Sequence, residues 1–279
     1  MYSAKIVNQN GDELVLSFDN GIVFDISPLS GVDVDISSSQ SFSQVGVSIE
    51  GTSVEGTARE IFGVIAKNEK ENFDKISKTL SPFSKGKLYI GDRYCDFVVQ
   101  KSPVFIREKS GRLTFNTEIF CAFPFWLESK QSSHTLGGVE PAFSFPVVYD
   151  SHIFGIRKPV ATTNIYNPGN VKQSIHISFS TLSTTKNFGI INPNTGQFVK
   201  VKGTISEADV VDVYQEDGKL KVELTRNYVT TNIIGKITEG STFFEFNVGD
   251  NIVMPFADEG VEDLSVTIEF NPAYTGVFV

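Results

Sequence analysis

The chain has 279 residues, of which 40% are apolar and 20% charged, and its formal net charge at pH 7 is −9. This composition excludes collagen, coiled coils and bulk disorder, and the acidic excess argues against binding to nucleic acid or to anionic membranes. Phe is frequent, with 24 residues, whereas there are only 3 His and 2 Cys. We therefore expect a large apolar core with few groups suited to catalysis or metal binding.

The first residues show no charged leader followed by an apolar run, and no segment approaches the roughly 18 consecutive apolar residues of a membrane span. We expect a protein made in a cytoplasm, with no membrane partner. From the N-terminus onward, apolar and polar residues alternate, which is the pattern of half-buried strands. The clearest runs begin at Leu14, Val45, Leu113, Ile175, Leu220 and Leu264. Each run is expected to turn one face toward a core.

Turn signals separate these runs. Asn10-Gly11 and Asn20-Gly21 are suited to the positive φ angles of tight hairpins. One segment, residues 69–80, departs from the strand pattern because its apolar side chains fall on one helical stripe. These side chains are Phe73, Ile76 and Leu80. Asn68 is the expected N-cap and Pro82 stops the helix, so we predict one amphipathic helix across the first sheet.

A polar stretch from Glu128 to Gly138 follows the apolar run that ends at Trp126, and its composition is typical of a linker. We therefore predict two domains, residues 1–133 and 134–279, each large enough to close its own core. Both are expected to be hairpin-rich and antiparallel, so the fold class is mainly β.

The charge is unevenly distributed. Residues 1–58 hold one basic and eight acidic residues, net −7, whereas residues 59–112 hold twelve basic and seven acidic residues, net +5. Two interpretations stay open. The charges belong to solvated surface that balances within one domain, or the two segments meet on neighbouring copies in a head-to-tail ring.

Groups with catalytic or metal-binding chemistry are few. His134, His152 and His176 have no second His or Cys at ligand spacing, so structural or surface roles are expected. Cys95 and Cys121 are interpreted as reduced core thiols. No catalytic residue, metal site or cofactor is predicted, and the chain is not expected to be an enzyme.

Two acidic clusters and a group of aromatic residues admit two interpretations each. The clusters at Asp209–Asp212 and Asp258–Asp263 are rich in oxygen ligands but lack the spacing of the familiar calcium loop, which favours solvated loops over calcium sites. The aromatic residues are suited either to stacking on sugar rings or to a core and domain seam. They are Phe123, Phe125, Trp126 and Tyr149.

Several segments, in order along the chain, carry a family resemblance. GTAREIFGVIAKN starts at Gly56, SPFSKGKLYIGDRY starts at Ser81, and IFCAFPFW ends at Trp126. The C-terminal half adds NIYNPGNV, INPNTGQFVKVKGTI, VVDVYQEDGKL and FFEFNVGDNIV. Together they resemble the distal tail protein (Dit) family of long-tailed bacteriophages, also called siphovirus-type tail components. Ser81 departs from the family pattern, in which Asn is commoner.

The resemblance assigns motif or structural roles to eleven residues: Gly56, Arg59, Glu60, Pro82, Gly86, Cys121, Pro124, Phe125, Trp126, Gly249 and Asn251. It implies a small N-terminal β-barrel with one helix, similar to tail-tube proteins, and a C-terminal β-sandwich similar to galectins or carbohydrate-binding modules. It also implies a structural hub at the virion tail tip.

As the resemblance implies, the hub is a homo-hexameric ring. It joins the major tail tube protein to a tail-associated fibre or lysin protein and carries receptor-binding or baseplate proteins. DNA only passes through its channel, and an acidic lumen would let it pass without sticking.

Two other functions compete with the hub. A carbohydrate-binding adhesin would recognise a cell-wall saccharide through the C-terminal domain, although residues 134–279 contain no Trp and fold analogy alone transfers no site. A tail-borne glycosidase would need a pair of carboxylates in a cleft, and no such pair can be located in the sequence.

Overall fold

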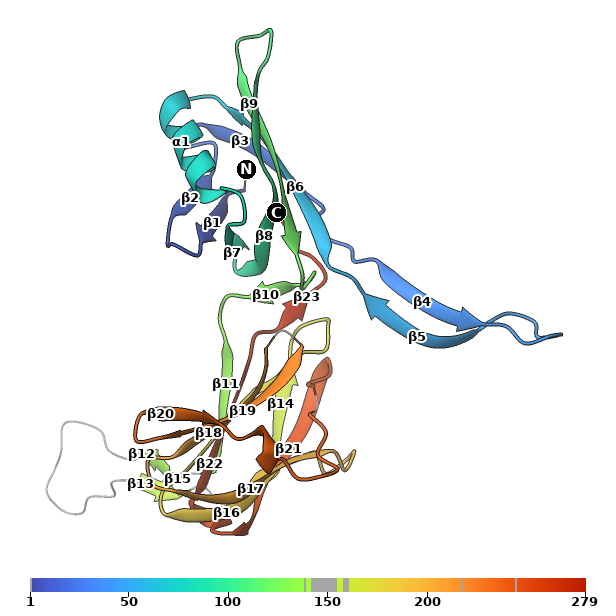
Figure 1. The fold of residues 1–279 in the computed structure, drawn as a ribbon, viewed down its shortest axis with the longest axis vertical. Coiled ribbons are helices and arrows are strands. Elements are labelled where there is room, and N and C mark those ends of the chain that lie inside the picture. The colour runs from blue at the N-terminus through green and yellow to red at the C-terminus, as the bar shows by residue number, and fades with distance from the viewer. Residues whose placement is uncertain (1, 138, 142–154, 158–160, 217, 244) are drawn as a thin grey trace, which may run out of the picture. The chain divides into compact units, whose positions relative to one another are not determined.

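The computed structural model describes residues 2–137, 139–141, 155–157, 161–216, 218–243 and 245–279 (Figure 1). The chain divides into two compact units. Unit 1 comprises Met1–Lys130 together with Ala273–Val279, and unit 2 comprises Gln131–Pro272. His152 and Tyr149, which the sequence analysis singled out, lie outside the described residues.

Unit 1 is built on an antiparallel sheet with the strand order β2-β1-β7-β8-β9-β6-β3. The short strands β10 and β23 pair with each other, and β10 also pairs with β8. The strands are β1 (Ala4–Asn8), β2 (Glu13–Leu16), β3 (Ile22–Ser27), β6 (Thr57–Ile65), β7 (Lys85–Ile90), β8 (Arg93–Arg107), β9 (Leu113–Cys121), β10 (Trp126–Glu128) and β23 (Ala273–Tyr274).

The mainly β class is confirmed, but the closed barrel expected for the first domain is wrong. Among the described residues, the two ends of the strand order, β2 and β3, form no ladder with each other. The chain turns directly after Leu16, and the carbonyl of Gly21 accepts a hydrogen bond from the Ala66 N–H at 2.7 Å. This bond directs β3 along β6 rather than back along the four residues of β2, so the sheet stays open.

The helix α1 (Glu69–Thr79) lies where the apolar stripe predicts it. Ile76 and Leu80 are fully buried in the core of unit 1, whereas Phe73 is 39% exposed and contacts Phe105 with 4.3 Å between ring centroids. Asn68 occupies the N-cap position as predicted, but its φ is 50° and its side chain makes no capping hydrogen bond.

Unit 2 is a sandwich of two antiparallel sheets. One sheet has the order β11-β22-β15-β18-β19-β20 and the other β14-β21-β16-β17. The strands are β11 (Ser132–Gly137), β14 (Thr163–Asn167), β15 (His176–Thr181), β16 (Thr184–Ile191), β17 (Phe198–Ser206), β18 (Val210–Glu216), β19 (Lys219–Arg226), β20 (Val229–Asn232), β21 (Gly249–Glu259) and β22 (Leu264–Phe270). A separate pair, β12 (Val139–Pro141) and β13 (Gly155–Arg157), and two short 3-10 helices, η1 (Ile234–Lys236) and η2 (Val261–Asp263), complete the unit.

One apolar core joins the two sheets of unit 2. Phe179 of β15 meets Phe188 of β16 with 5.2 Å between ring centroids, and Phe246 meets Phe270 at 5.4 Å. Since these pairs bring together residues from different strands and loops, they account for part of the Phe excess in the composition. Burial of such side chains is the main stabilising contribution to a sandwich of this kind.

The boundary between the units differs in two ways from the predicted division at residue 133. Most of the expected linker is β11, which pairs with β22 over its full length. Its outward side chains Ser133 and Thr135 are exposed while Leu136 is buried, and a polar edge strand has the same composition as a linker. The last seven residues also return to unit 1, where β23 pairs with β10.

Candidate functional site

A two-stranded hairpin of unit 1 has no sheet beneath it. It consists of β4 (Val34–Ser39), β5 (Ser48–Val54) and the loop between them, and we call residues 34–54 the arm. Figure 1 shows the arm extending away from the sheet of unit 1. Its large apolar side chains are all substantially exposed: Val34, Ile36, Phe42, Val45, Val47, Ile49 and Val54. The expectation that the run from Val45 to Ile49 faces a core is therefore wrong.

The arm is the outer half of one long hairpin. Its inner half is formed by β3 and β6, which pair along six residues in the sheet of unit 1. The arm and its flanks, residues 33–55, contain Asp33, Asp35, Glu50 and Glu55 and no Lys or Arg. An acidic hairpin with bare apolar side chains has the features of a surface that is completed by another molecule.

The point where the arm joins the sheet, which we call the root, is organised by a buried arginine. Arg59 of β6 is 1% exposed. Its Nη2 donates a hydrogen bond to the carbonyl of Pro124 at 2.8 Å, its Nη1 donates to the carbonyl of Pro28, and its guanidinium lies 4.7 Å from the ring centre of Trp126. In the described part of the chain, no carboxylate comes within ion-pair distance of Arg59. Its role is thus to tie backbone segments together.

Trp126 and the C-terminal segment complete the root. The indole Nε1 of Trp126 donates to the carbonyl of Leu29 at 3.0 Å. That carbonyl also accepts from the Val277 N–H at 3.1 Å, and the Gly31 N–H donates to the carbonyl of Thr275 at 3.2 Å. Because Leu29 and Gly31 immediately precede β4, these bonds fix the direction in which the arm leaves unit 1.

Close packing surrounds the root. A Cβ at Gly56 would lie 2.4 Å from the Phe120 ring and 2.9 Å from the Cys121 carbonyl, so only glycine fits where β6 begins. Cys121 and Cys95 are free and buried, as predicted, with 3.6 Å between their sulfur atoms. Hydrogen bonding to Cys121, together with burial, raises the pKa of the Cys95 thiol well above its usual value.

The structure thus brings together five of the eleven motif residues at the root: Gly56, Arg59, Cys121, Pro124 and Trp126. Two others lie close by in sequence but face elsewhere. Glu60 is exposed and accepts a hydrogen bond from Asn116 at 2.5 Å, and the Phe125 ring packs against Phe123 with 5.1 Å between centroids.

The remaining motif residues serve local structure away from the root. Pro82 is exposed just after the helix. Gly86 lets β7 approach β1, since a Cβ there would lie 2.3 Å from the Val7 carbonyl. In unit 2, the buried Asn251 closes a loop: its Nδ2 donates to the carbonyls of Asn247 at 2.8 Å and Gly249 at 2.9 Å.

Of the acidic residues that were expected in solvated loops, at least four have partners on unit 2. Lys200 pairs with Asp258 at 2.7 Å, and Lys186 pairs with Glu259 at 2.9 Å. Asp209 is buried, and Arg226 donates to both its carboxylate oxygens at 2.8 and 2.6 Å. Asp212 lies on β18 and bonds His176 at 3.0 Å. Across the described residues, no group of three or more His, Cys, Asp or Glu is placed to hold a metal ion, and no helix is long and apolar enough to cross a membrane.

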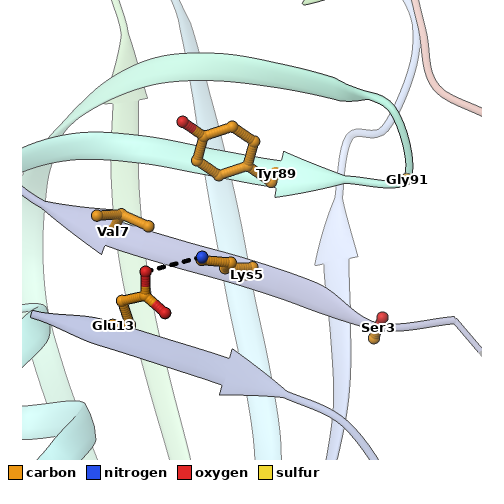
Figure 2. Close-up of a pocket in the computed structure, with 6 residues that line it drawn as sticks. All are labelled: Ser3, Lys5, Val7, Glu13, Tyr89 and Gly91. Carbon is orange, nitrogen blue, oxygen red and sulfur yellow. Dashed lines mark ion pairs between the residues drawn. The ribbon is translucent and has the colours of Figure 1, made fainter. Parts of the chain in front are cut away.

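An open depression lies on the outer face of β2, β1 and β7. Figure 2 shows Lys5 and Glu13 paired across β1 and β2, with Tyr89 of β7 beside them. The ion pair spans 2.8 Å and both side chains are about half exposed. An exposed pair of this kind contributes little to stability. Among the described residues that line the depression, no nucleophile is hydrogen-bonded to a base. It has the character of surface rather than of an active site.

These features define a mainly β protein whose distinctive site is a protruding hairpin and whose second unit is a sandwich. Residues 168–274 match the family described as "Siphovirus-type tail component, C-terminal domain". This match, over part of the chain, confirms the resemblance to distal tail proteins. None of the curated proteins matches the chain in sequence.

A solved structure of a phage protein shares the fold. The crystal structure of SPP1 Dit (gp 19.1), described as a paradigm of the hub adsorption apparatus in phages that infect Gram-positive bacteria, superposes with a TM-score of 0.66 at 9% identity, over 96% of this chain and 98% of that chain. A chain of the phage P2 baseplate in its activated conformation with Ca gives a TM-score of 0.48 at 11% identity, over 96% and 98% of the two chains.

Proposed function

We propose that this chain is the structural hub of a siphophage tail tip, assembled as a ring of six copies through its arm. The observation that carries the proposal is the arm itself: a hairpin with both faces exposed and seven exposed apolar side chains packs against no sheet among the described residues of unit 1. The SPP1 Dit likeness in fold over nearly the whole chain supports the hub.

The occupant of the arm is a second copy of the chain. One face of the sheet formed by β3, β6, β9 and β8 presents a set of exposed apolar side chains, as the strand registers show. They are Val23, Phe62, Val98, Val104, Ile106 and Phe120. Exposed apolar area of this extent on both surfaces favours their association. The arm of one copy covers this face of the next, which is the head-to-tail contact that closes a ring.

Complementary charge also favours this contact. Residues 33–55 carry four of the eight acidic residues in the negative segment, whereas residues 59–112, which include β8 and most of β6, carry a net +5. Opposite potentials on the two surfaces speed association and disfavour the wrong pairing. Assembly is therefore expected to weaken as salt screens the charges.

In the virion, one side of the ring docks on the major tail tube protein and the other on a tail-associated fibre or lysin protein. Receptor-binding or baseplate proteins are carried at the periphery by unit 2, which we assign to the galectin or carbohydrate-binding-module type of sandwich. The channel passes DNA without binding it. The subunit is made in the bacterial host cytoplasm, and its role is structural rather than enzymatic.

The test compares the purified full-length chain with Ile36→Ser/Ile49→Ser, which removes apolar contact from the arm. Light scattering and negative-stain microscopy should show sixfold rings for the unchanged protein, and dissociation in the variant and in high salt. A matched control, Val229→Ser/Ile234→Ser, alters two similarly exposed residues of unit 2 and should leave the rings intact. A strict monomer at high concentration, or rings that are indifferent to the arm substitutions, would contradict the proposal.

A further inference from the structure

The two cysteines of the chain lie against each other in the core of unit 1. Cys95 is on β8 and Cys121 is the last residue of β9, and these strands are neighbours in the sheet. Both are buried free thiols, with 3.6 Å between their sulfur atoms. Since the strands are adjacent, rotation of the two side chains, with a displacement of about 1.5 Å, brings the sulfur atoms to the length of a disulfide bond.

A buried cation lies beside this pair. The register of β6 and β9 sets Arg59 opposite Ile119 and Thr57 opposite Cys121, so Arg59 and Cys121 are diagonal neighbours. The Nε of Arg59 is buried and has no hydrogen-bond partner in the described structure. A buried N–H is costly without an acceptor, and a buried charge is costly without a counter-charge. A thiolate at Cys121 supplies both.

The environment makes the two thiols unequal. The hydrogen bond with Cys95 and the charge of the Arg59 guanidinium lower the pKa of the Cys121 thiol, against the opposing effect of burial. The same hydrogen bond, together with burial, raises the pKa of the Cys95 thiol. Because the thiolate is the nucleophile in thiol chemistry, Cys121 is suited to react first and Cys95 to attack the product.

Cys121 lies at the end of its strand rather than in the middle. Directly after it, Ala122 and Phe123 are exposed in the loop that leads to Trp126. Opposite it, β6 begins at Thr57, and the preceding Gly56 has no side chain to cover the end of the strand. Local opening of this loop therefore exposes the Cys121 sulfur to a small neutral oxidant without unfolding of unit 1.

We propose that Cys95 and Cys121 form a redox-active pair that closes to a disulfide when the protein meets a peroxide. The Cys121 thiolate attacks one oxygen of hydrogen peroxide, the O–O bond breaks, and the leaving hydroxide takes up the proton that Cys121 had lost. Cys121 is then a sulfenic acid. Cys95 attacks its sulfur, the S–O bond breaks, and the leaving hydroxide takes up the Cys95 proton. Two thiols and one peroxide thus give one disulfide and two water molecules.

This bond joins β8 to β9 beside the root, between residues 26 positions apart in the chain. Reducing surroundings keep the pair open, and oxidising surroundings close it. The chemistry needs no second copy of the chain, so the site is independent of ring assembly.

The experiment treats the reduced full-length protein, at low concentration, with hydrogen peroxide and then blocks the remaining thiols with N-ethylmaleimide in denaturant. Intact mass should show a chain that has lost two hydrogen atoms and takes up no maleimide. Peptide mapping should find Cys95 and Cys121 in one cross-linked product, and dithiothreitol should restore both thiols. The matched control is the same protein treated with peroxide in denaturant, where the environment no longer distinguishes the two cysteines.

Two serine variants assign the roles, and thermal melts verify that each is folded. Cys95→Ser should stop at a sulfenic acid on Cys121, which dimedone traps. Cys121→Ser should leave a Cys95 thiol that reacts roughly tenfold or more slowly than Cys121 does in Cys95→Ser.

The proposal is overturned if both thiols survive a peroxide concentration that oxidises the denatured chain. It is also overturned if oxidation yields cross-linked dimers instead of the internal bond, or if Cys95 in Cys121→Ser reacts as fast as Cys121 in Cys95→Ser. Light scattering on the same samples measures ring formation separately, so failure of this inference is distinguishable from failure of the hub.

Discussion

The arm and the inner half of the same hairpin differ in almost every physical respect. Ile26 of β3 is 1% exposed and faces the core of unit 1, whereas Ile36 of β4 is 59% exposed and faces no core. The two residues share a side chain, a strand context and a hairpin. The difference is that β3 packs against the core of unit 1, whereas β4 has no core beneath it. One hairpin can therefore be buried at one end and exposed at the other.

The root separates these two behaviours. Arg59, Trp126 and the C-terminal segment bind the backbone of residues 28–31 from three sides. The inner half of the hairpin, β3 and β6, is held by packing in the core of unit 1. The arm is held by these hydrogen bonds to the residues at its base. An arm that is held only at its base keeps a defined direction without burying its own apolar surface.

The largest expected effect comes from the matched pair of isoleucines. Ile26→Ala should lower the free energy of unfolding by about 2–5 kcal/mol, because it removes buried methyl groups and leaves a cavity. Ile36→Ala should change it by less than about 0.5 kcal/mol in the dissociated protein. Chemical denaturation at low protein concentration measures both values. Equal losses for the two variants would mean that the arm is packed against its own chain.

The next effect tests the root. Arg59→Ala should cost about 2–4 kcal/mol, because the carbonyls of Pro28 and Pro124 lose a donor and a cavity opens beside Trp126. Arg107→Ala is the control, since Arg107 pairs with Glu69 at 2.7 Å on the surface and should cost less than about 1 kcal/mol. Thermal and denaturant unfolding compare the two. A loss no greater than that of the control would show that Arg59 does not secure the root.

The smallest expected loss of stability concerns Arg226 of unit 2. Arg226 binds a carboxylate, whereas Arg59 binds carbonyls. Arg226 hydrogen-bonds Asp209 and lowers the pKa of that carboxyl below its ordinary value of 3.8. The stabilisation that results is fully present above the pKa that Asp209 has in the unfolded chain. It is lost as the pH falls through the lower pKa that Asp209 has in the folded protein. Asp209→Asn should therefore cost about 1–2 kcal/mol at pH 7, and the difference should shrink below a pH of about 4.

Denaturant unfolding at several pH values measures this difference. The Arg59→Ala penalty serves as the reference, because Arg59 pairs with no carboxylate among the described residues and its cost should not follow the same pH course. A penalty for Asp209→Asn that persists unchanged at low pH would indicate a packing effect rather than loss of the charged pair.

Local pattern predicts the mainly β fold and the helix well, because side-chain alternation and the helical stripe at Ile76 and Leu80 are local properties. It does not show what lies beneath a strand. The run ending at Ile49 has the alternation of a half-buried strand, yet it belongs to the exposed arm. The polar strand β11 resembles a linker in composition. Its pairing with β22 joins residues far apart in the sequence, so the local pattern does not reveal it.

The root was accessible from sequence only through motif resemblance. Gly56, Arg59, Pro124 and Trp126 were singled out from segments far apart in the chain, and no spacing rule connects them to the carbonyl of Leu29. The one sign of the arm in the sequence is chemical: residues 33–55 combine exposed Ser-rich stretches and four acidic residues with no Lys or Arg. A segment of one charge sign with interspersed apolar residues is a reasonable signal for an assembly surface.

The return of Ala273–Val279 to unit 1 has a mechanical consequence. Unit 2 is attached by two peptide connections, one after Lys130 and one after Pro272, and the second continues into β23 and its ladder with β10. A pulling force on unit 2, such as the tension on a tail tip held to a cell surface, is therefore divided between two points of unit 1. A single proteolytic cut at either connection leaves unit 2 tethered, and exchange of this unit between related proteins requires an insertion rather than a fusion at one end.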